Sequence, residues 1–209
     1  MNSRMMMFSA LIMVALSVCA KKVKLTIDGT TSRSQTTLYL VVNKDTANAQ
    51  RIPVNDAKFS VTVKVDKNDF IRLLDNKQRP DRGGFVLIPD NHHITVDIWD
   101  GKVEGSPMSQ RLQNAVRAIQ SAGPGTFHID VFSEDPKAWE EARAQESAIR
   151  AKMEEQQREL VRKVMLENKD NNIPAWILYC FPELAYKYLD EVTKDSPKWM
   201  RHPLLIMKQ

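Results

Sequence analysis

The two cysteines, Cys19 and Cys180, are the residues best suited to covalent chemistry in this chain of 209 residues. Cys180 lies between Tyr179 and Phe181 in an apolar segment, where burial would raise the pKa of a thiol and keep it unreactive. We interpret Cys180 as a buried core residue, and a reactive thiol is the alternative. No C-x-x-C motif includes either cysteine.

Histidine is the next candidate for chemistry, and His92 and His93 are adjacent at the start of an expected strand. Neighbouring residues of a strand point to opposite faces, so the two rings cannot bind one metal ion together unless the turn bends there. We therefore predict a solvated turn at this dipeptide, with a metal site as the alternative. His128 and His202 are isolated in the sequence.

Motifs that carry known catalytic chemistry are missing from the sequence. It contains no G-x-S-x-G, no H-E-x-x-H, no P-loop and no dinucleotide-binding fingerprint. We therefore predict a non-catalytic protein with no catalytic residues, no metal ligands and no cofactor.

Residues 1–20 have the pattern of a secretory signal peptide. One arginine precedes an apolar segment, Met5 to Val18, that is too short to span a bilayer, and small residues follow at Cys19 and Ala20. Cleavage after Ala20 would remove Cys19. Alternatively, Leu16 to Cys19 resembles a bacterial lipobox, although Val18 departs from the small residue expected before the cysteine, and Cys19 would then carry a lipid.

The charge of the exported chain is nearly balanced. Without residues 1–20 it has 29 basic and 26 acidic residues, a net charge of +3. This balance argues against nucleic acid as a binding partner. Contact with a membrane is therefore expected only through a lipid at Cys19. No intrachain disulfide is expected, because Cys180 is then the one remaining cysteine unless Cys19 is kept. We expect an exported protein whose partner is an unidentified envelope protein or another envelope component.

Residues 21–105 read as short strands separated by turns. The segment 59–65 alternates between apolar and polar residues, which is typical of a strand with one buried face. Asp28-Gly29 is expected to end the first strand in a turn, and Pro53 indicates an edge strand. The expected strands are 23–27, 36–43, 51–54, 59–65, 70–74, 85–88, 93–99 and 102–104. This spacing predicts an antiparallel β-sandwich or an open barrel.

Residues 106–209 read as helices, so the chain is expected to combine a β-domain with a helical region that packs on it or extends from it, an α+β fold. Ser106 followed by Pro107 is a typical helix start. Asp135-Pro136 begins a long helix to about Glu167. We expect this helix to be docked at both ends and solvated in its middle, with a coiled coil as the alternative. Later helices are expected from Pro174, over 184–192, and from Pro197 through Met207.

The order of these parts resembles one family. A signal peptide is followed by the segments 24–29, 59–65, 94–96 and 103–106, and then by a long charged helix that ends in Glu167 to Ala175. This order is similar to the N-terminal domain of unknown function that precedes the thioredoxin-like module in Gram-negative envelope thiol–disulfide oxidoreductases. The resemblance covers about Val23 to Gln209, and the module with its C-x-x-C does not follow here.

The resemblance implies an envelope location and an accessory or binding role. No residue of this chain can inherit the redox site. We therefore expect a non-catalytic binding or accessory module. Two alternatives are a redox accessory that partners a separate oxidoreductase through Cys180, and a structural oligomer held together by helices.

Overall fold

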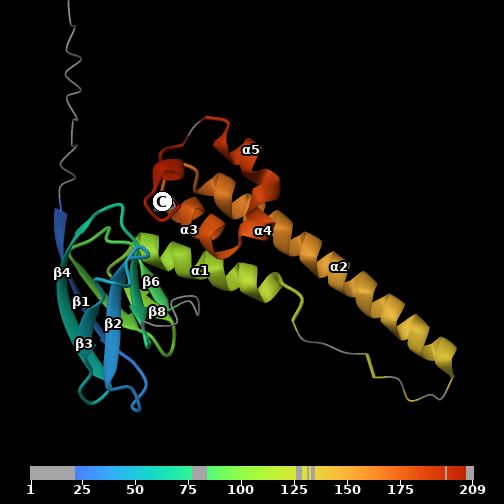
Figure 1. The fold of residues 1–209 in the computed structure, drawn as a ribbon, viewed down its shortest axis with the longest axis horizontal. Helices are drawn as coiled ribbons and strands as arrows, with labels where there is room; N and C mark the ends of the chain where they lie inside the picture. Colours follow the sequence, from blue (N-terminus) through green and yellow to red (C-terminus); the bar gives the residue numbers. More distant parts are fainter. Residues whose placement is uncertain are drawn as a thin grey trace, which may run out of the picture.

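The computed structural model describes residues 22–76, 84–125, 129–130, 132, 135–195 and 197–205. The predicted signal peptide and Cys19 lie outside these residues. Strands gather on one side of the molecule and helices on the other, and one helix projects far beyond both (Figure 1). The prediction of an α+β chain with a strand-rich first half and a helical second half is confirmed.

The first sheet, sheet A, has the strand order β4-β1-β7-β8. It contains β1 (Lys22–Thr30), β4 (Lys58–Asp66), β7 (His93–Asp97) and β8 (Lys102–Glu104). β1 pairs antiparallel with β4 along nine residues, whereas it pairs parallel with β7. The prediction of antiparallel strands is therefore wrong for β1 and β7. β1 lies in the middle of the sheet, between β4 and β7, and runs in the same direction as β7.

The second sheet, sheet B, has the order β3-β2-β5-β6 and all its pairs are antiparallel. It contains β2 (Thr37–Val42), β3 (Gln50–Pro53), β5 (Ile71–Leu74) and β6 (Phe85–Leu87). β3 lies at the edge, as Pro53 predicted, because a proline lacks the N–H that a second neighbouring strand would need.

The two sheets face each other across an apolar core, as in a sandwich. Leu25, Ile27 and Ile94 of sheet A meet Leu40, Ile71 and Leu87 of sheet B in one buried cluster. The alternation predicted over 59–65 places Phe59, Val61 and Val65 in this core. Burial of these side chains is the main favourable contribution to the stability of the sandwich.

A second core joins the other face of sheet B to the helices. Phe70, Val86 and Ile88 pack against residues of every larger helix. These helices are α1 (Pro107–Ala122), α2 (Pro136–Glu167) and α3 (Ile173–Cys180). Sheet B is thus covered on both faces, which explains why all residues of β5 and β6 are buried.

The end of the chain is more broken than predicted. The expected helix over 184–192 is divided into α4 (Pro182–Ala185), the 3₁₀ turn η2 (Tyr186–Tyr188) and α5 (Leu189–Thr193). The helix expected from Pro197 is only the short 3₁₀ turn η3 (Lys198–Arg201). Trp199 of η3 is buried in the second core, so tertiary packing rather than helix propensity determines this segment.

The junction between the two halves has the predicted helix start. Ser106 caps α1, since its side chain accepts a hydrogen bond from the backbone N–H of Ser109, and Pro107 begins the helix. The hydroxyl of Ser109 in turn accepts a hydrogen bond from the N–H of Ile88 at 2.8 Å. These buried serines tie the first turn of α1 to the end of β6.

Gly29 does not end the first strand, so the turn predicted there is wrong. β1 continues through Gly29 to Thr30, and Gly29 lies opposite both Phe59 and Val96. A Cβ atom at Gly29 would lie 2.6 Å from the Phe59 ring and 2.6 Å from a Val96 methyl group. The glycine is therefore needed for close packing in the sandwich and not for a turn.

We expect Gly29→Ala to lower the free energy of unfolding by about 1–3 kcal/mol, because the added methyl group overpacks the core. Gly125→Ala is the matched control, since a Cβ at Gly125 meets no atom within 4 Å, and its effect should stay within about 0.5 kcal/mol. Urea denaturation of both variants checks this expectation. Equal stability of the two variants would contradict it.

Candidate functional site

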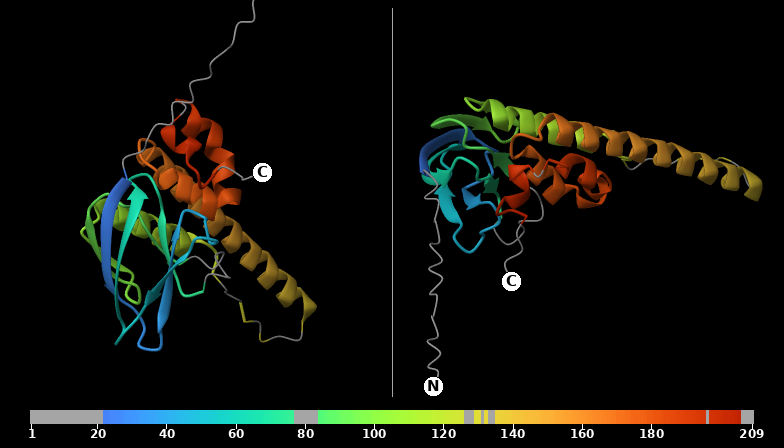
Figure 2. Two further views of the ribbon diagram at one scale, coloured as in Figure 1. Left: turned by 60° about the vertical axis from the view of Figure 1, so that its left-hand side comes forward. Right: turned by 90° about the horizontal axis from the view of Figure 1, so that it is seen from above.

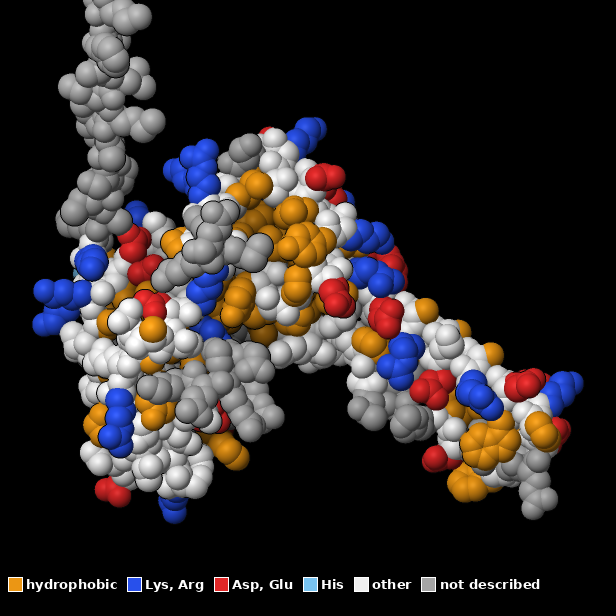
Figure 3. All heavy atoms as spheres, viewed as in Figure 1, with side chains coloured by type: hydrophobic (Ala, Val, Ile, Leu, Met, Phe, Trp, Pro, Cys, Tyr) orange, Lys and Arg blue, Asp and Glu red, His pale blue; other side chains and the backbone are white. Residues whose placement is uncertain are grey.

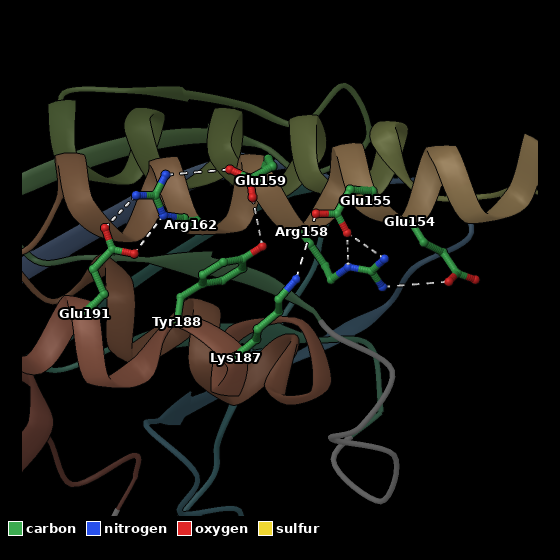
Figure 4. Close-up of polar contacts among 8 residues, drawn as sticks. All are labelled: Glu154, Glu155, Arg158, Glu159, Arg162, Lys187, Tyr188 and Glu191. Carbon is green, nitrogen blue, oxygen red and sulfur yellow. Dashed lines mark hydrogen bonds and ion pairs between the residues drawn. The ribbon is translucent and has the colours of Figure 1, made fainter.

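An ionic network attaches the C-terminal helices to α2 (Figure 4). Arg162 makes two hydrogen bonds to Glu191, at 2.7 and 2.6 Å, and Tyr188 donates one to Glu159 at 3.1 Å. Further along α2, Glu155 pairs with both Arg158 and Lys187, at 2.8 and 3.8 Å. The charged groups are at least partly exposed, so each ion pair stabilises little by itself. Together with buried Tyr188, these contacts set how η2 and α5 lie on α2.

The N-terminal half of α2 extends past the end of this network. We call residues 136–153 the arm, and Figures 1 and 2 show it projecting beyond α1 and α4. The buried residues of α2 are Val161, Val164 and Met165, all near its other end. The expectation that α2 is docked at both ends is therefore wrong, because the packing is at its C-terminal end.

The arm exposes large apolar side chains. Trp139 and Ile149 are 45% and 46% exposed, and Phe132, just before the helix, is 98% exposed. At about 100° per residue, Trp139, Ile149 and Met153 fall in the same sector of roughly 120° as the packed residues Leu160, Val161 and Val164. The face that docks α2 onto the body thus continues along the arm, interrupted by the ion pair of Glu146 and Arg150 in the same sector. We call its apolar residues Trp139, Ile149 and Met153 the arm stripe.

An open hollow of about 680 Å³ lies at the base of the arm, and Cys180 lines it together with Gln157, Arg158 and Phe181. Cys180 is exposed, so its interpretation as a buried core residue is wrong. Protein atoms still displace much of the water around the thiol, and this desolvation raises its pKa to about 11, although the charge of Arg72 acts in the opposite direction. At neutral pH the thiol is therefore almost entirely protonated.

On the outer face of sheet A, a hydroxyl, a carboxylate and an imidazole lie together, as the side chains of a catalytic triad do. His93 Nε2 lies 2.7 Å from the Asp28 carboxylate, and hydrogen bonds from Ser60 and His93 lower the pKa of Asp28. A nucleophilic triad needs the imidazole between the hydroxyl and the carboxylate, whereas here the carboxylate lies in the middle. The cluster is a polar contact between strands.

His92 and His93 do not share a ligand site. His93 pairs with Asp28, whereas His92 directs Nδ1 toward the carbonyl oxygen of Lys24 at 3.3 Å. Among the described residues, no group of three or more His, Cys, Asp or Glu side chains could hold a metal ion. Within the same ranges, every helix is too short or too polar to cross a membrane.

His202 is a buried histidine that sequence reasoning left aside. Its Nε2 lies 2.6 Å from the carbonyl oxygen of Asn68, and its Nδ1 accepts a hydrogen bond from the N–H of Leu204. The ring also packs on Phe70, with 4.8 Å between centroids. Burial lowers the pKa of His202, although the hydrogen bond to Asn68 acts in the opposite direction. The ring is therefore neutral in the folded protein at neutral pH.

We expect Cys180 to react slowly in the folded protein. A rise in thiol pKa from 9.0 to about 11 lowers the thiolate fraction at neutral pH about 100-fold. Alkylation by iodoacetamide should therefore be about 100-fold slower in buffer than in urea. Equal rates in the two conditions would contradict the environment described for this thiol.

We also expect stability to fall in mildly acidic solution because of His202. The unfolded chain binds a proton near pH 6.5, whereas the folded chain binds it at lower pH, so the free energy of unfolding decreases as pH falls below about 6.5. His202→Gln should flatten this slope between pH 7 and 5, and the exposed His92→Gln control should retain it. Denaturant titrations across this range check the result, and an unchanged slope in His202→Gln would refute the assignment.

Comparison with known proteins assigns no family to this chain. No protein-family model, no curated protein and no solved structure matches it. The resemblance to an envelope oxidoreductase domain therefore stays a prediction, and the function has to be argued from the surfaces described above.

Proposed function

We propose that this protein is a non-catalytic binding module of the cell envelope that holds a protein partner through its arm. The observation that carries this proposal is the arm stripe, which continues the docked face of α2 into solvent with Trp139 and Ile149 half exposed. A helix gains most of its stability in proteins from packing of an apolar face, and Ile149, within the arm, leaves 46% of its surface exposed to a partner.

The chemistry of the stripe indicates the kind of partner. Between Pro136 and Met153 the sequence has four basic and three acidic residues. The arm is therefore close to neutral, with charges of both signs beside its apolar face and, at the Glu146–Arg150 ion pair, within it. A partner that fits it is a protein with an apolar-faced helix and mixed-charge flanks, as in helix-to-helix recognition.

The polar groups on the outer face of sheet A support a non-catalytic role. The Ser60, Asp28 and His93 side chains meet there, but the carboxylate separates the hydroxyl from the imidazole. In this order the Ser60 hydroxyl faces a carboxylate whose pKa is lowered, which is a weak base, and not the imidazole. The contact stabilises neighbouring strands and leaves the hydroxyl unactivated.

A redox accessory role is the second candidate, and one observation favours it. Cys180 reaches the surface beside an open hollow, where the thiol of another protein could approach it. The raised pKa opposes this role, because the thiolate is the attacking species in disulfide exchange. We therefore rank this candidate below binding through the arm.

Site-specific photo-crosslinking in the native host tests the arm. A photoreactive amino acid at Ile149, within the stripe, should give one adduct of defined mass, and Trp139→Ala should abolish it because it truncates the largest side chain of the stripe. Ala148 is the matched control position, since it lies on the opposite side of the same helix and is also exposed.

The adduct should be absent when the photoreactive group is at position 148. Adducts of equal yield at both positions, or none at either, would rule out the arm stripe as the binding face. An adduct with twice the mass of the chain would identify the partner as a second copy.

A further inference from the structure

Four lysines gather at one end of sheet A. Lys22 and Lys24 lie on β1, Lys64 lies on β4, and Lys67 follows it directly. All four are exposed, and in the sequence they form two pairs that are 40 residues apart. We call them the lysine cluster. The antiparallel pairing of β1 with β4 is what brings the two pairs together.

Two of these lysines face each other directly. Lys24 and Lys64 are cross-strand partners in the β1–β4 register, so their side chains project from the same face of the sheet. Like charges in this position repel each other. The positive charge of sheet A is therefore concentrated at Lys24 and Lys64, whereas the same strand pairing places Lys22 opposite Asp66.

One carboxylate lies beside the cluster, since Asp66 is the cross-strand partner of Lys22, and it offsets one of the four positive charges. Asp66 accepts a hydrogen bond from the N–H of Asn68, and Asp69 accepts one from the N–H of Asp66, both at 2.8 Å. Within the part of the chain that the structure describes, none of the four lysines forms an ion pair. The remaining positive charge is thus available to an external anion.

The position of the cluster selects the kind of anion. Lys22 is only three residues after Cys19, so a lipid on Cys19 would hold this end of sheet A within about 10 Å of its attachment point. None of the described helices covers the outer face of sheet A, which lies on the side of the sandwich away from these helices (Figures 1 and 2). Figure 3 shows Lys and Arg side chains along this edge of the molecule, with Asp and Glu side chains among them.

The residue type fits a membrane better than a single phosphate group. Lysine is a flexible point charge, whereas a pocket for one phosphate commonly uses the two-pronged geometry of arginine. A basic surface is a common second attachment beside a lipid, since each lysine or arginine near an anionic membrane adds to the attraction. The lysine cluster can supply that second attachment.

We propose that the lysine cluster docks the β-domain on a membrane surface of anionic phospholipids. The proposal rests on the envelope location of the proposed function but uses a different surface from the arm. Docked in this way, the protein would hold sheet A near the lipid headgroups. The arm and its stripe would be directed away from the lysine cluster, toward a partner.

Vesicle sedimentation tests the proposal with residues 21–209, which retain every described strand and helix. The vesicles contain phosphatidylcholine and phosphatidylglycerol in a roughly two-to-one ratio, at low salt. The wild-type chain should bind these vesicles and not vesicles of phosphatidylcholine alone. Lys24→Glu with Lys64→Glu should weaken binding at least about tenfold, because it reverses two charges at the surface.

Two further variants make the result specific. Lys137→Glu with Lys152→Glu makes the same change of net charge on the arm, at exposed positions, and should bind as the wild type does. Lys24→Gln with Lys64→Gln removes the repulsion between the strands, so this variant should fold at least as stably as the wild type. It should nevertheless bind the anionic vesicles more weakly than the wild type does. This neutral variant keeps the test valid if the doubly acidic variant fails to fold.

Three outcomes would overturn the proposal. The first is a wild-type chain that does not bind the anionic vesicles, and the second is an equal loss in the arm variant, which would indicate net charge alone. The third is release of the chain from vesicles by millimolar inorganic phosphate at constant ionic strength, which would assign the cluster to a soluble anion. None of these outcomes affects the crosslinking test of the arm, so the two proposals fail separately.

Discussion

The packing of the helices on sheet B is the constraint on which the rest of the structure depends. Phe70 lies at the centre of this contact, with its ring centroid 5.2 Å from that of Trp176 and 4.8 Å from that of His202. Because the other face of sheet B already forms the sandwich, this contact turns one sheet into the middle layer of the molecule. It also determines the direction in which α2, and therefore the arm, leaves the body.

Local sequence patterns predicted the elements well where the pattern and the packing agree. The alternation over 59–65 and the Asp135-Pro136 helix start correspond closely to β4 and α2. The patterns failed where a distant neighbour decides the conformation. Gly29 was expected in a turn because glycine is typical there, but the Phe59 ring and Val96 need its missing side chain within a strand.

The surfaces that could carry function were harder to predict, for the same reason. Asp28 and His93 are 65 residues apart, and their contact follows from the parallel pairing of β1 with β7. The net charge gave no sign of the lysine cluster, since averaging over the chain hides charges that strand pairing concentrates. Cys180 was assigned from its apolar neighbours, although the end of α3 places it at the surface.

The central place of β1 in sheet A has a consequence for the order of folding. The strand is synthesised first, yet its two neighbours, β4 and β7, begin 36 and 71 residues after Lys22. β1 therefore gains its second neighbour only after Asp97 has been made, and closing such long loops slows folding. Until then β1 keeps at least one unpaired edge, and such an edge can pair with a strand of another chain during synthesis.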